Sequence, residues 1–317
     1  MLVEHGPDRI QSRSVASAPG GFLFEEEKTM GLSQAKQLRQ LLAAPGVLLM
    51  PSVYDAMSAK LVERAGFKAS FMGGFAVSAS RLGVPDTGLI SYTEMLDQGR
   101  NICGAVNIPI IGDGDTGYGN AINARRTVQG YEQAGFACVM IEDQVAPKRC
   151  GHTRGKQTVV RDEAFARVQA AVDARDEGAD ILIMARTDAA ATDGFEEALA
   201  RAKGFAEIGV DITFLEAPRS IEDMRRYCDE VPGHKMANMV EQGDTPYLSA
   251  EELHDIGYKI AIYPLTLLLA SIHAMEQALA AFARGEVPKD GVADFAHLQE
   301  IIGFPEYYEM ERRYASA

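Results

Sequence analysis

The sequence has 317 residues, of which 47% are hydrophobic and 24% are charged, a balance typical of one large globular domain or two smaller ones. Its 31 basic and 45 acidic residues give a net charge of -14, so the field of the protein repels nucleic acid backbones and anionic membrane surfaces. The composition therefore disfavours a nucleic-acid-binding or membrane-surface protein.

The remaining global features predict a cytoplasmic protein. The longest apolar stretch, Ala261–Ala270, is too short for a bilayer span, so we expect no insertion into a membrane. Four cysteines without a C-x-x-C spacing are too few for a disulfide framework and favour a reducing compartment. Residues 1–30 lack both periodicity and the apolar core of a secretory signal, and we expect them to form a loosely ordered leader.

A helix, a glycine and a short apolar run follow one another five times along the chain. Together with three runs between them, they predict eight strands, near Val47–Ser52, Lys68–Gly74, Pro109–Asp115, Ala137–Asp143, Ile181–Asp188, Ile212–Pro218, Lys235–Glu241 and Ile260–Leu265. The glycine of each copy falls where a helix needs a left-handed cap before the strand, at Gly66, Gly135, Gly178, Gly209 and Gly257.

These strands are apolar nearly throughout, which indicates a parallel sheet that helices cover on both faces. The length, and the lack of a G-x-G-x-x-G fingerprint after the first strand, favour an α/β (β/α)8 TIM-type barrel over an open doubly wound sheet, which remains the alternative. We predict one such barrel over residues 31–317, with a C-terminal helical extension. The helix pattern Leu265–Ala283 is apolar on every face, so we expect it to be buried against another subunit.

Acidic side chains gather where the predicted strands end, which is where barrel enzymes have their active sites. They follow the third to sixth strands, at Asp113, Asp115, Glu142, Asp143, Asp188 and Glu216. Alternation along the strand puts Asp113 and Asp115 on one side, and the glycines beside them leave room for a ligand. Crowded carboxylates predict a site for a hard cation, Mg2+ or Mn2+. For Asp143 and Asp188, capping of the next helix is an equal alternative.

The loop Lys148–Lys156 is strongly basic in an acidic protein and contains two glycines. It predicts a gating lid that attracts a carboxylate-bearing substrate and carries a reactive thiol, Cys150. The alternative is a solvated basic loop with an incidental cysteine. The spacing of Cys150 and His152 does not fit a zinc site.

An ordered set of motifs resembles the isocitrate lyase and phosphoenolpyruvate mutase superfamily from Lys36 to the C-terminus. The motifs are P-D (Pro85–Asp86), G-D-G-D-T-G-Y-G (Gly112–Gly119), I-E-D-Q (Ile141–Gln144), K-R-C-G-H (Lys148–His152), A-R-T-D (Ala185–Asp188), L-E-A-P (Leu215–Pro218) and A-N-M-V-E (Ala237–Glu241). The resemblance implies a barrel that binds Mg2+, or Mn2+ in its place, through Asp113 directly and through Asp115, Glu142 and Asp86 by way of waters. It also implies a homodimer or homotetramer whose subunits exchange the eighth helix.

The K-R-C-G-H motif implies the lyase branch of the superfamily, in which Cys150 acts as acid or base at the released carbon. Typical methylisocitrate lyases have S-G-G-G-V-A-A-A and N-I-T-E-F-G where this chain has Gly73–Ser80 and Asn238–Gly243. These departures resemble the branch that cleaves 2-alkylmalates, dimethylmalate or oxaloacetate. Val240 in place of a threonine should favour an alkyl group over a second carboxylate.

The resulting hypothesis is a retro-aldol cleavage between C2 and C3 of a small 2-hydroxy dicarboxylate, which releases an oxo acid such as pyruvate. The residues expected to take part are Cys150, Arg186, Glu216 and His152 in catalysis and Tyr54, Gly73, Gly74, Phe75, Gly151 and Asn238 in substrate binding. The alternatives are an oxaloacetate hydrolase or decarboxylase, and then a methylisocitrate lyase, which Val240 and Phe75 disfavour. From a different class, a catalytically silent barrel that acts as a binding protein is disfavoured by the intact Asp113 and Cys150.

Overall fold

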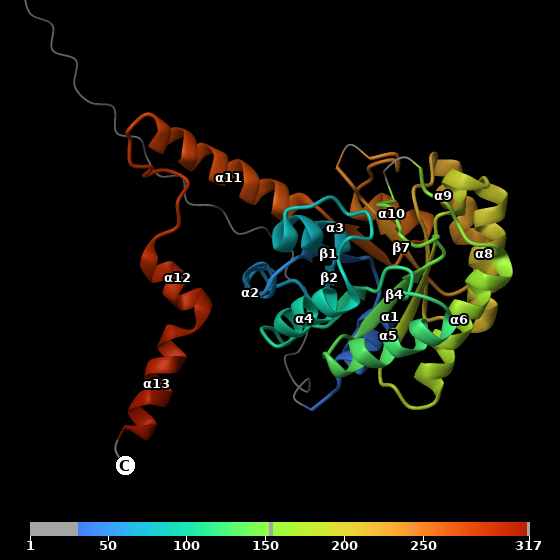
Figure 1. Ribbon diagram of the computed structural model, residues 1–317, viewed down its shortest axis with the longest axis horizontal. Coiled ribbons are helices and arrows are strands. Elements are labelled where there is room, and N and C mark those ends of the chain that lie inside the picture. The colour runs from blue at the N-terminus through green and yellow to red at the C-terminus, as the bar shows by residue number, and fades with distance from the viewer. Residues whose placement is uncertain (1–30, 152–154, 242, 316–317) are drawn as a thin grey trace, which may run out of the picture. The chain divides into compact units, whose positions relative to one another are not determined.

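The computed structural model describes residues 31–151, 155–241 and 243–315. The predicted leader, residues 1–30, and His152 lie outside these ranges. Eight parallel strands hydrogen-bond in sequence order and close into a barrel, which confirms the predicted TIM-type α/β fold (Figure 1). The strands are β1 (Leu48–Val53), β2 (Ser70–Met72), β3 (Ile110–Asp113), β4 (Cys138–Glu142), β5 (Leu182–Thr187), β6 (Ile212–Leu215), β7 (His234–Asn238) and β8 (Ile260–Tyr263). The open-sheet alternative is therefore wrong.

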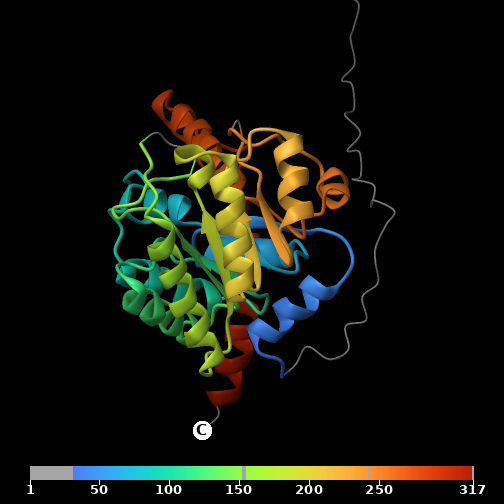
Figure 2. The same ribbon diagram turned by 90° about the vertical axis from the view of Figure 1, so that its right-hand side faces the viewer.

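Helices surround the strands, as the two views in Figures 1 and 2 show. The helices of the barrel are α1 (Gln34–Ala43), α2 (Ala56–Arg64), α3 (Gly74–Val77), the π-helix η1 (Ser78–Leu82), α4 (Tyr92–Cys103), α5 (Ala121–Gln133), α6 (Arg161–Asp176), α7 (Ala189–Thr192), α8 (Phe195–Ile208), α9 (Ile221–Glu230) and α10 (Ala250–Ile256). Three more follow β8, namely α11 (Thr266–Ala283), α12 (Phe295–Ile302) and α13 (Phe304–Tyr314).

The inside of the barrel is a packed apolar core to which every strand contributes at least one side chain. It includes Met50 of β1, Met184 of β5 and Met236 of β7, all fully buried. Helix α1 adds Leu38 and Leu42 to the same cluster. Polar groups are therefore excluded from the middle of the barrel and are left to gather beyond the carboxyl ends of the strands.

The strand register aligns the functional side chains of neighbouring strands. In the β4–β5 pair, Glu142 is opposite Arg186, and in the β3–β4 pair Asp113 is opposite Met140. Because β3 ends at Asp113, Asp115 lies beyond the strand, in a turn with a left-handed φ of 48°. The alternation expected for Asp113 and Asp115 is therefore not what brings them together.

Helix α11 carries the apolar face that the sequence predicts, but within this chain almost nothing covers it. Only Leu268 and Ala281 are buried on it, whereas five large apolar side chains are exposed, namely Leu269, Ile272, Met275, Leu279 and Phe282. By length and composition alone, α11 is the one helix within the described ranges that could cross a bilayer, and 11% of it is buried. Length and composition cannot distinguish a membrane span from a helix that another protein surface covers.

The glycine caps of the repeated unit have the predicted geometry, with a positive φ at all five positions. Gly209 ends α8 with a φ of 101°, and its amide donates to Phe205 O and Ala206 O. No heavy atom lies within 4 Å of the position that a Cβ would take there, so the backbone angle alone demands glycine.

We therefore expect Gly209→Ala to lower the free energy of unfolding by about 1 kcal/mol, because an alanine Cβ disfavours the left-handed conformation. Gly209→Asn should cost less, since asparagine tolerates this region. Calorimetric unfolding of both variants at equal protein concentration measures the difference. Equal melting temperatures for the alanine variant and the parent would contradict this explanation of the cap.

Candidate active site

A cavity of about 250 Å³ lies at the carboxyl ends of the strands. Its lining contains ten of the predicted site residues, namely Gly73, Gly74, Phe75, Asp86, Asp113, Cys150, Gly151, Arg186, Glu216 and Asn238. These residues come from loops and strand ends between β2 and β7, so the barrel brings together positions that are distant in the sequence. The cavity is therefore the candidate active site.

Three carboxylates, Asp86, Asp113 and Asp115, form what we call the acidic cluster. Asp113 Oδ1 accepts from the Asp115 amide at 3.0 Å, and Asp113 Oδ2 accepts from the Gly74 amide at 3.0 Å. Gly74, which we expected to take part in substrate binding, thus donates its amide to Asp113 here. A Cβ at position 74 would lie 2.8 Å from Asp113 Oδ2, so only glycine allows this approach.

A buried lysine neutralises part of the acidic cluster. Lys148 Nζ lies 2.8 Å from Asp86 Oδ2 and 2.8 Å from Asp115 Oδ1. Burial lowers the pKa of Lys148, but the surrounding carboxylates, Asp115 first among them, raise it well above its ordinary value, so the ammonium stays charged. The alternative of a solvated basic loop is therefore wrong for Lys148, whose side chain is buried among acids.

The acidic cluster fits a hydrated divalent cation. Burial raises the pKa of Asp115 to about 6, and it also raises the pKa of Glu142 well above its ordinary value. Within the described ranges, Asp86 Oδ1 and Glu142 Oε1 are buried without a hydrogen-bond partner. No three acids, histidines or cysteines of the described chain stand close enough to bind a metal by themselves, so a metal here would need waters to complete its coordination.

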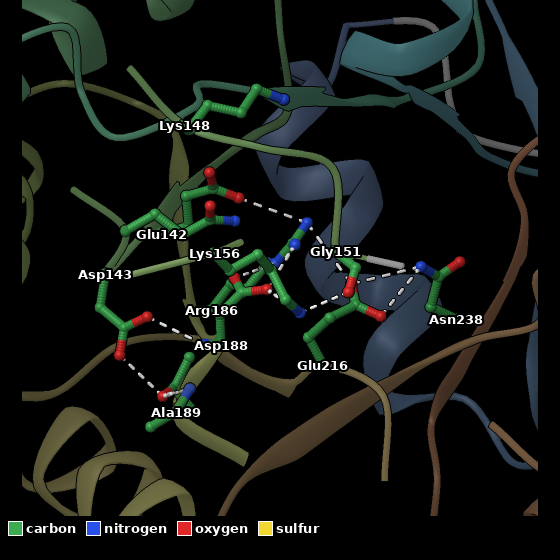
Figure 3. A network of polar contacts seen from close by, with 12 residues as sticks. Glu142, Asp143, Lys148, Gly151, Lys156, Arg186, Asp188, Ala189, Glu216 and Asn238 are labelled. Atoms are coloured by element: carbon green, nitrogen blue, oxygen red, sulfur yellow. Dashed lines mark hydrogen bonds and ion pairs between the residues drawn. The ribbon is translucent and has the colours of Figure 1, made fainter. Parts of the chain in front are cut away.

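A second buried group surrounds Arg186 of β5, and we call it the guanidinium cluster (Figure 3). Arg186 Nε and Nη2 donate to the two oxygens of Asp188 at 2.8 and 2.9 Å. Its Nη1 lies 3.3 Å from Glu142 Oε2 and 3.4 Å from Glu216 Oε2. The Asn238 amide donates to both oxygens of Glu216 at 3.3 Å. Three carboxylates thus hold the guanidinium in place at the cavity, and Asn238 in turn binds one of them.

Asp188 binds the Arg186 guanidinium directly, and Asp143 in turn binds the Asp188 amide. Asp143 accepts from Thr187 Oγ1 at 2.7 Å and from the Asp188 amide at 2.8 Å, and Arg201 Nη1 lies 3.0 Å away. Asp188 precedes α7 but makes no side-chain cap bond to it. Neither acid therefore caps a helix, and neither belongs to the acidic cluster.

The described part of the segment that follows Lys148, residues 149–151 and 155–156, has no regular secondary structure, as predicted, and Cys150 and Gly151 line the cavity. Cys150 is half-buried, and its amide donates to Asp86 O at 3.2 Å. A Cβ on Gly151 would lie 2.5 Å from Arg186 Nη2, so glycine is needed for this close approach. Lys156 Nζ donates to Gly151 O and to Asp188 Oδ1, the latter at 3.0 Å. The segment thus contacts both charged clusters.

The rest of the cavity wall is apolar. It is made of Phe75, Val240 and Leu265, together with Phe71, Met140, Phe214, Ile262 and Pro264. The Arg186 guanidinium lies 5.4 Å from the centre of the Phe214 ring, which is close enough for a cation–π contact. A ligand in this cavity therefore meets both charged groups and hydrocarbon.

Three described residues of the predicted site, Tyr54, Asp115 and Glu142, are not part of the cavity lining. The Tyr54 hydroxyl donates to Ser271 Oγ at 3.3 Å, and Tyr54 is not part of the cavity wall. Asp115 and Glu142 lie behind the wall, and His152 is outside the described residues. Sequence reasoning missed the buried Lys148, although a lysine that precedes Cys150 in an acid-rich protein was a usable signal.

Comparisons with known proteins find relatives along most of the chain. A family model described as phosphoenolpyruvate phosphomutase matches residues 38–283. A 2,3-dimethylmalate lyase from Eubacterium barkeri is 41% identical over 288 residues, which cover 90% of this chain and 99% of the relative. A structure of oxaloacetate acetylhydrolase with 3,3-difluorooxalacetate superposes with a TM-score of 0.85 at 34% identity, over 90% of this chain and 98% of the other.

A phosphonopyruvate hydrolase structure in complex with oxalate and Mg++ has a TM-score of 0.80 at 26% identity, over 90% of this chain and all of the other. The family match spans more than half of the chain, and the relatives are aligned along nearly their whole length. The chain therefore belongs to the phosphoenolpyruvate mutase and isocitrate lyase superfamily of enzymes.

Proposed function

We propose that this chain is a Mg2+-dependent carbon-carbon lyase that cleaves a 2-hydroxy dicarboxylate of the 2-alkylmalate or 2,3-dimethylmalate type. The products are an oxo acid such as pyruvate and a short carboxylate. The observation that supports this most is that one cavity wall contains Asp113 of the acidic cluster, Arg186 of the guanidinium cluster and a thiol, Cys150. This set suits a reaction in which negative charge develops on a substrate held at both ends.

The acidic cluster would hold the metal through Asp113, with Asp86, Asp115 and Glu142 acting through waters. A bound Mg2+ would supply positive charge that makes the substrate 2-hydroxyl acidic near neutral pH. The residues themselves fit this group because buried carboxylate oxygens of Asp86 and Glu142 have no hydrogen-bond donor among the described residues. Mg2+ in the phosphonopyruvate hydrolase structure supports the choice of ion.

Arg186 would bind the carboxylate of the fragment that leaves as a carbanion. Its guanidinium is buried and held by Asp188, Glu142 and Glu216, so it needs little rearrangement when charge develops nearby. Glu216 and Asn238 would orient the substrate through their polar atoms at the cavity wall. Gly73, Gly74 and Phe75 would contact the oxo-acid end.

Cys150 would deliver the proton that quenches the carbanion. Cys150 lies in a wall that also contains Arg186 and Lys148, and such cations lower the pKa of a thiol and so make it a stronger proton donor. The thiolate left behind would take up a proton again before the next turnover. His152 and Gly151 would assist from the same segment. This step distinguishes a lyase from a hydrolase or decarboxylase that uses the metal alone.

The apolar wall supports an alkyl-bearing substrate. Phe75, Val240 and Leu265 offer no hydrogen-bond partner for a third carboxylate, and burying an unpaired charge against them would be costly. This disfavours a methylisocitrate lyase, whose substrate carries three carboxylates. An oxaloacetate hydrolase remains the alternative, because a structure of oxaloacetate acetylhydrolase is also closely similar. A silent binding protein is disfavoured by the complete charge sets around Asp113 and Arg186.

We further propose that a second copy of this chain covers α11, within a cytoplasmic homodimer or homotetramer whose subunits exchange this helix. The exposed apolar side chains of α11 provide the contact area. His273 and Glu276 near the middle of α11 would be costly in a bilayer, which favours a protein partner over lipid.

If this assembly forms, light scattering at micromolar concentration should give the mass of a dimer or tetramer. Leu279→Asp, which places a charge on the exposed apolar face of α11, should shift the protein toward smaller species. Ile122→Asp, at an equally exposed apolar position on α5, is the matched control and should leave the mass unchanged. A fully active monomer would refute the proposed exchange.

For Cys150→Ser we expect kcat to fall about 100-fold or more, because a hydroxyl replaces a thiol with an ordinary pKa of ~8.5 and is a far poorer acid. Binding of oxalate should change little, since Arg186 and the metal contacts remain. Cys103→Ser, at the end of α4, is the control and should keep normal turnover. If Cys150→Ser cleaved every 2-hydroxy diacid at nearly the normal rate, the lyase assignment would give way to a metal-only hydrolase or decarboxylase.

A further inference from the structure

The contacts of Lys148 with the acidic cluster are not used in the mechanism above. Its ammonium lies in the middle of the acidic cluster, 2.8 Å from Asp86 Oδ2 and 2.8 Å from Asp115 Oδ1. All three side chains are about 95% buried. The Lys148 ammonium thus lies between buried carboxylates and compensates part of their negative charge.

A metal ion at the same carboxylates would have to share them with this ammonium. Mg2+ binds oxygens at 2.0–2.1 Å in an octahedron and keeps several waters, so water-bridged carboxylates stand only about 4 Å from it. An ammonium and a metal ion that share buried carboxylates repel each other strongly. A metal ion that drew on the two carboxylate oxygens in contact with Lys148 Nζ would therefore have to displace the ammonium from them.

We propose that Lys148 is a built-in counter-cation that competes with the metal ion for Asp86 and Asp115, so that metal entry displaces its ammonium from at least one of them. The proposal rests on the metal site of the proposed function. In the absence of metal, Lys148 keeps the buried carboxylates compensated and the cavity intact. Metal binding then opposes a pre-existing ion pair, which sets the affinity below what the carboxylates alone would give.

Displacement of the Lys148 ammonium would also affect the residues around Cys150. Lys148 and Cys150 are two residues apart, and the Cys150 amide donates to Asp86 O at 3.2 Å. The same aspartate therefore holds the segment by its backbone oxygen and Lys148 by its carboxylate. Release of the ammonium frees a cation beside Cys150, within a wall that a dicarboxylate must approach.

The test is calorimetric titration of Mg2+ into chelator-treated full-length protein without substrate. Lys148→Met removes the charge and keeps the length of the side chain, and it should tighten the dissociation constant for Mg2+ about tenfold or more. The metal-free variant should also melt at a lower temperature than the parent and regain more stability on adding Mg2+. Lys148→Gln is a second neutral variant, for use if the methionine variant folds poorly. It should tighten the dissociation constant for Mg2+ to the same extent.

Two further variants serve as controls. Arg149→Met removes the same charge from the next, exposed position and should change Mg2+ affinity less than twofold. Lys148→Arg keeps a cation in place and should bind Mg2+ no more tightly than the parent. These variants separate an effect of the ion pair from a general effect of loop charge.

The possible outcomes separate this proposal from the proposed function. If the parent binds Mg2+ and both neutral variants at position 148 bind it equally or more weakly, Lys148 supports the metal and the competition is refuted. If neither the parent nor the neutral variants bind Mg2+ at all, the metal site of the proposed function fails together with this inference. Binding that appears or strengthens only when Lys148 is neutralised supports it.

Discussion

Several carboxylates are buried together at one end of the barrel, and the rest of the active site follows from the need to neutralise them. Asp86, Asp113 and Asp115 share one lysine, while Glu142 and Glu216 share Arg186 with Asp188. Carboxylates outnumber cations in both clusters. Isolated buried charges are prohibitively unfavourable, so such a site either takes up protons, as the raised pKa of Asp115 and Glu142 indicates, or binds an external cation.

The fold tolerates this arrangement because the charged side chains lie beyond the carboxyl ends of the strands, outside the closely packed apolar interior of the barrel. Close approaches between charged groups then depend on the absence of side chains at a few positions. Gly74 allows Asp113 to accept a backbone hydrogen bond, and Gly151 allows the Cys150 segment to pass beside Arg186. Ala217, which directly follows Glu216, adopts a left-handed φ of 53°, a strained conformation of the kind often found at functional sites. These local backbone features thus allow the close contacts that the buried charged groups make.

The barrel was predictable because a glycine in each copy of the repeated unit marks the end of the helix. A glycine such as Gly209 or Gly257 forces the helix to end, and the apolar run after it must be buried on both faces. The gathering of Asp113, Arg186 and Glu216 followed from strand order alone. The pairing of Lys148 with Asp86 did not, because 62 residues separate them and loop conformation decides which acid a lysine meets. The hydrogen bond of the Tyr54 hydroxyl could not be predicted for a similar reason, since its partner Ser271 lies on α11, after the last strand.

The central claim is that an alkyl-bearing 2-hydroxy diacid is cut at a carbon-carbon bond within this cavity. The most direct measurement is product analysis with Mg2+ present, using 2,3-dimethylmalate, a series of 2-alkylmalates and oxaloacetate as separate substrates. The account predicts that an oxo acid and a short carboxylate appear in equal amounts from an alkyl-bearing malate and that EDTA abolishes the reaction. Release of acetate and oxalate from oxaloacetate, with no cleavage of any alkyl-bearing malate, would contradict it.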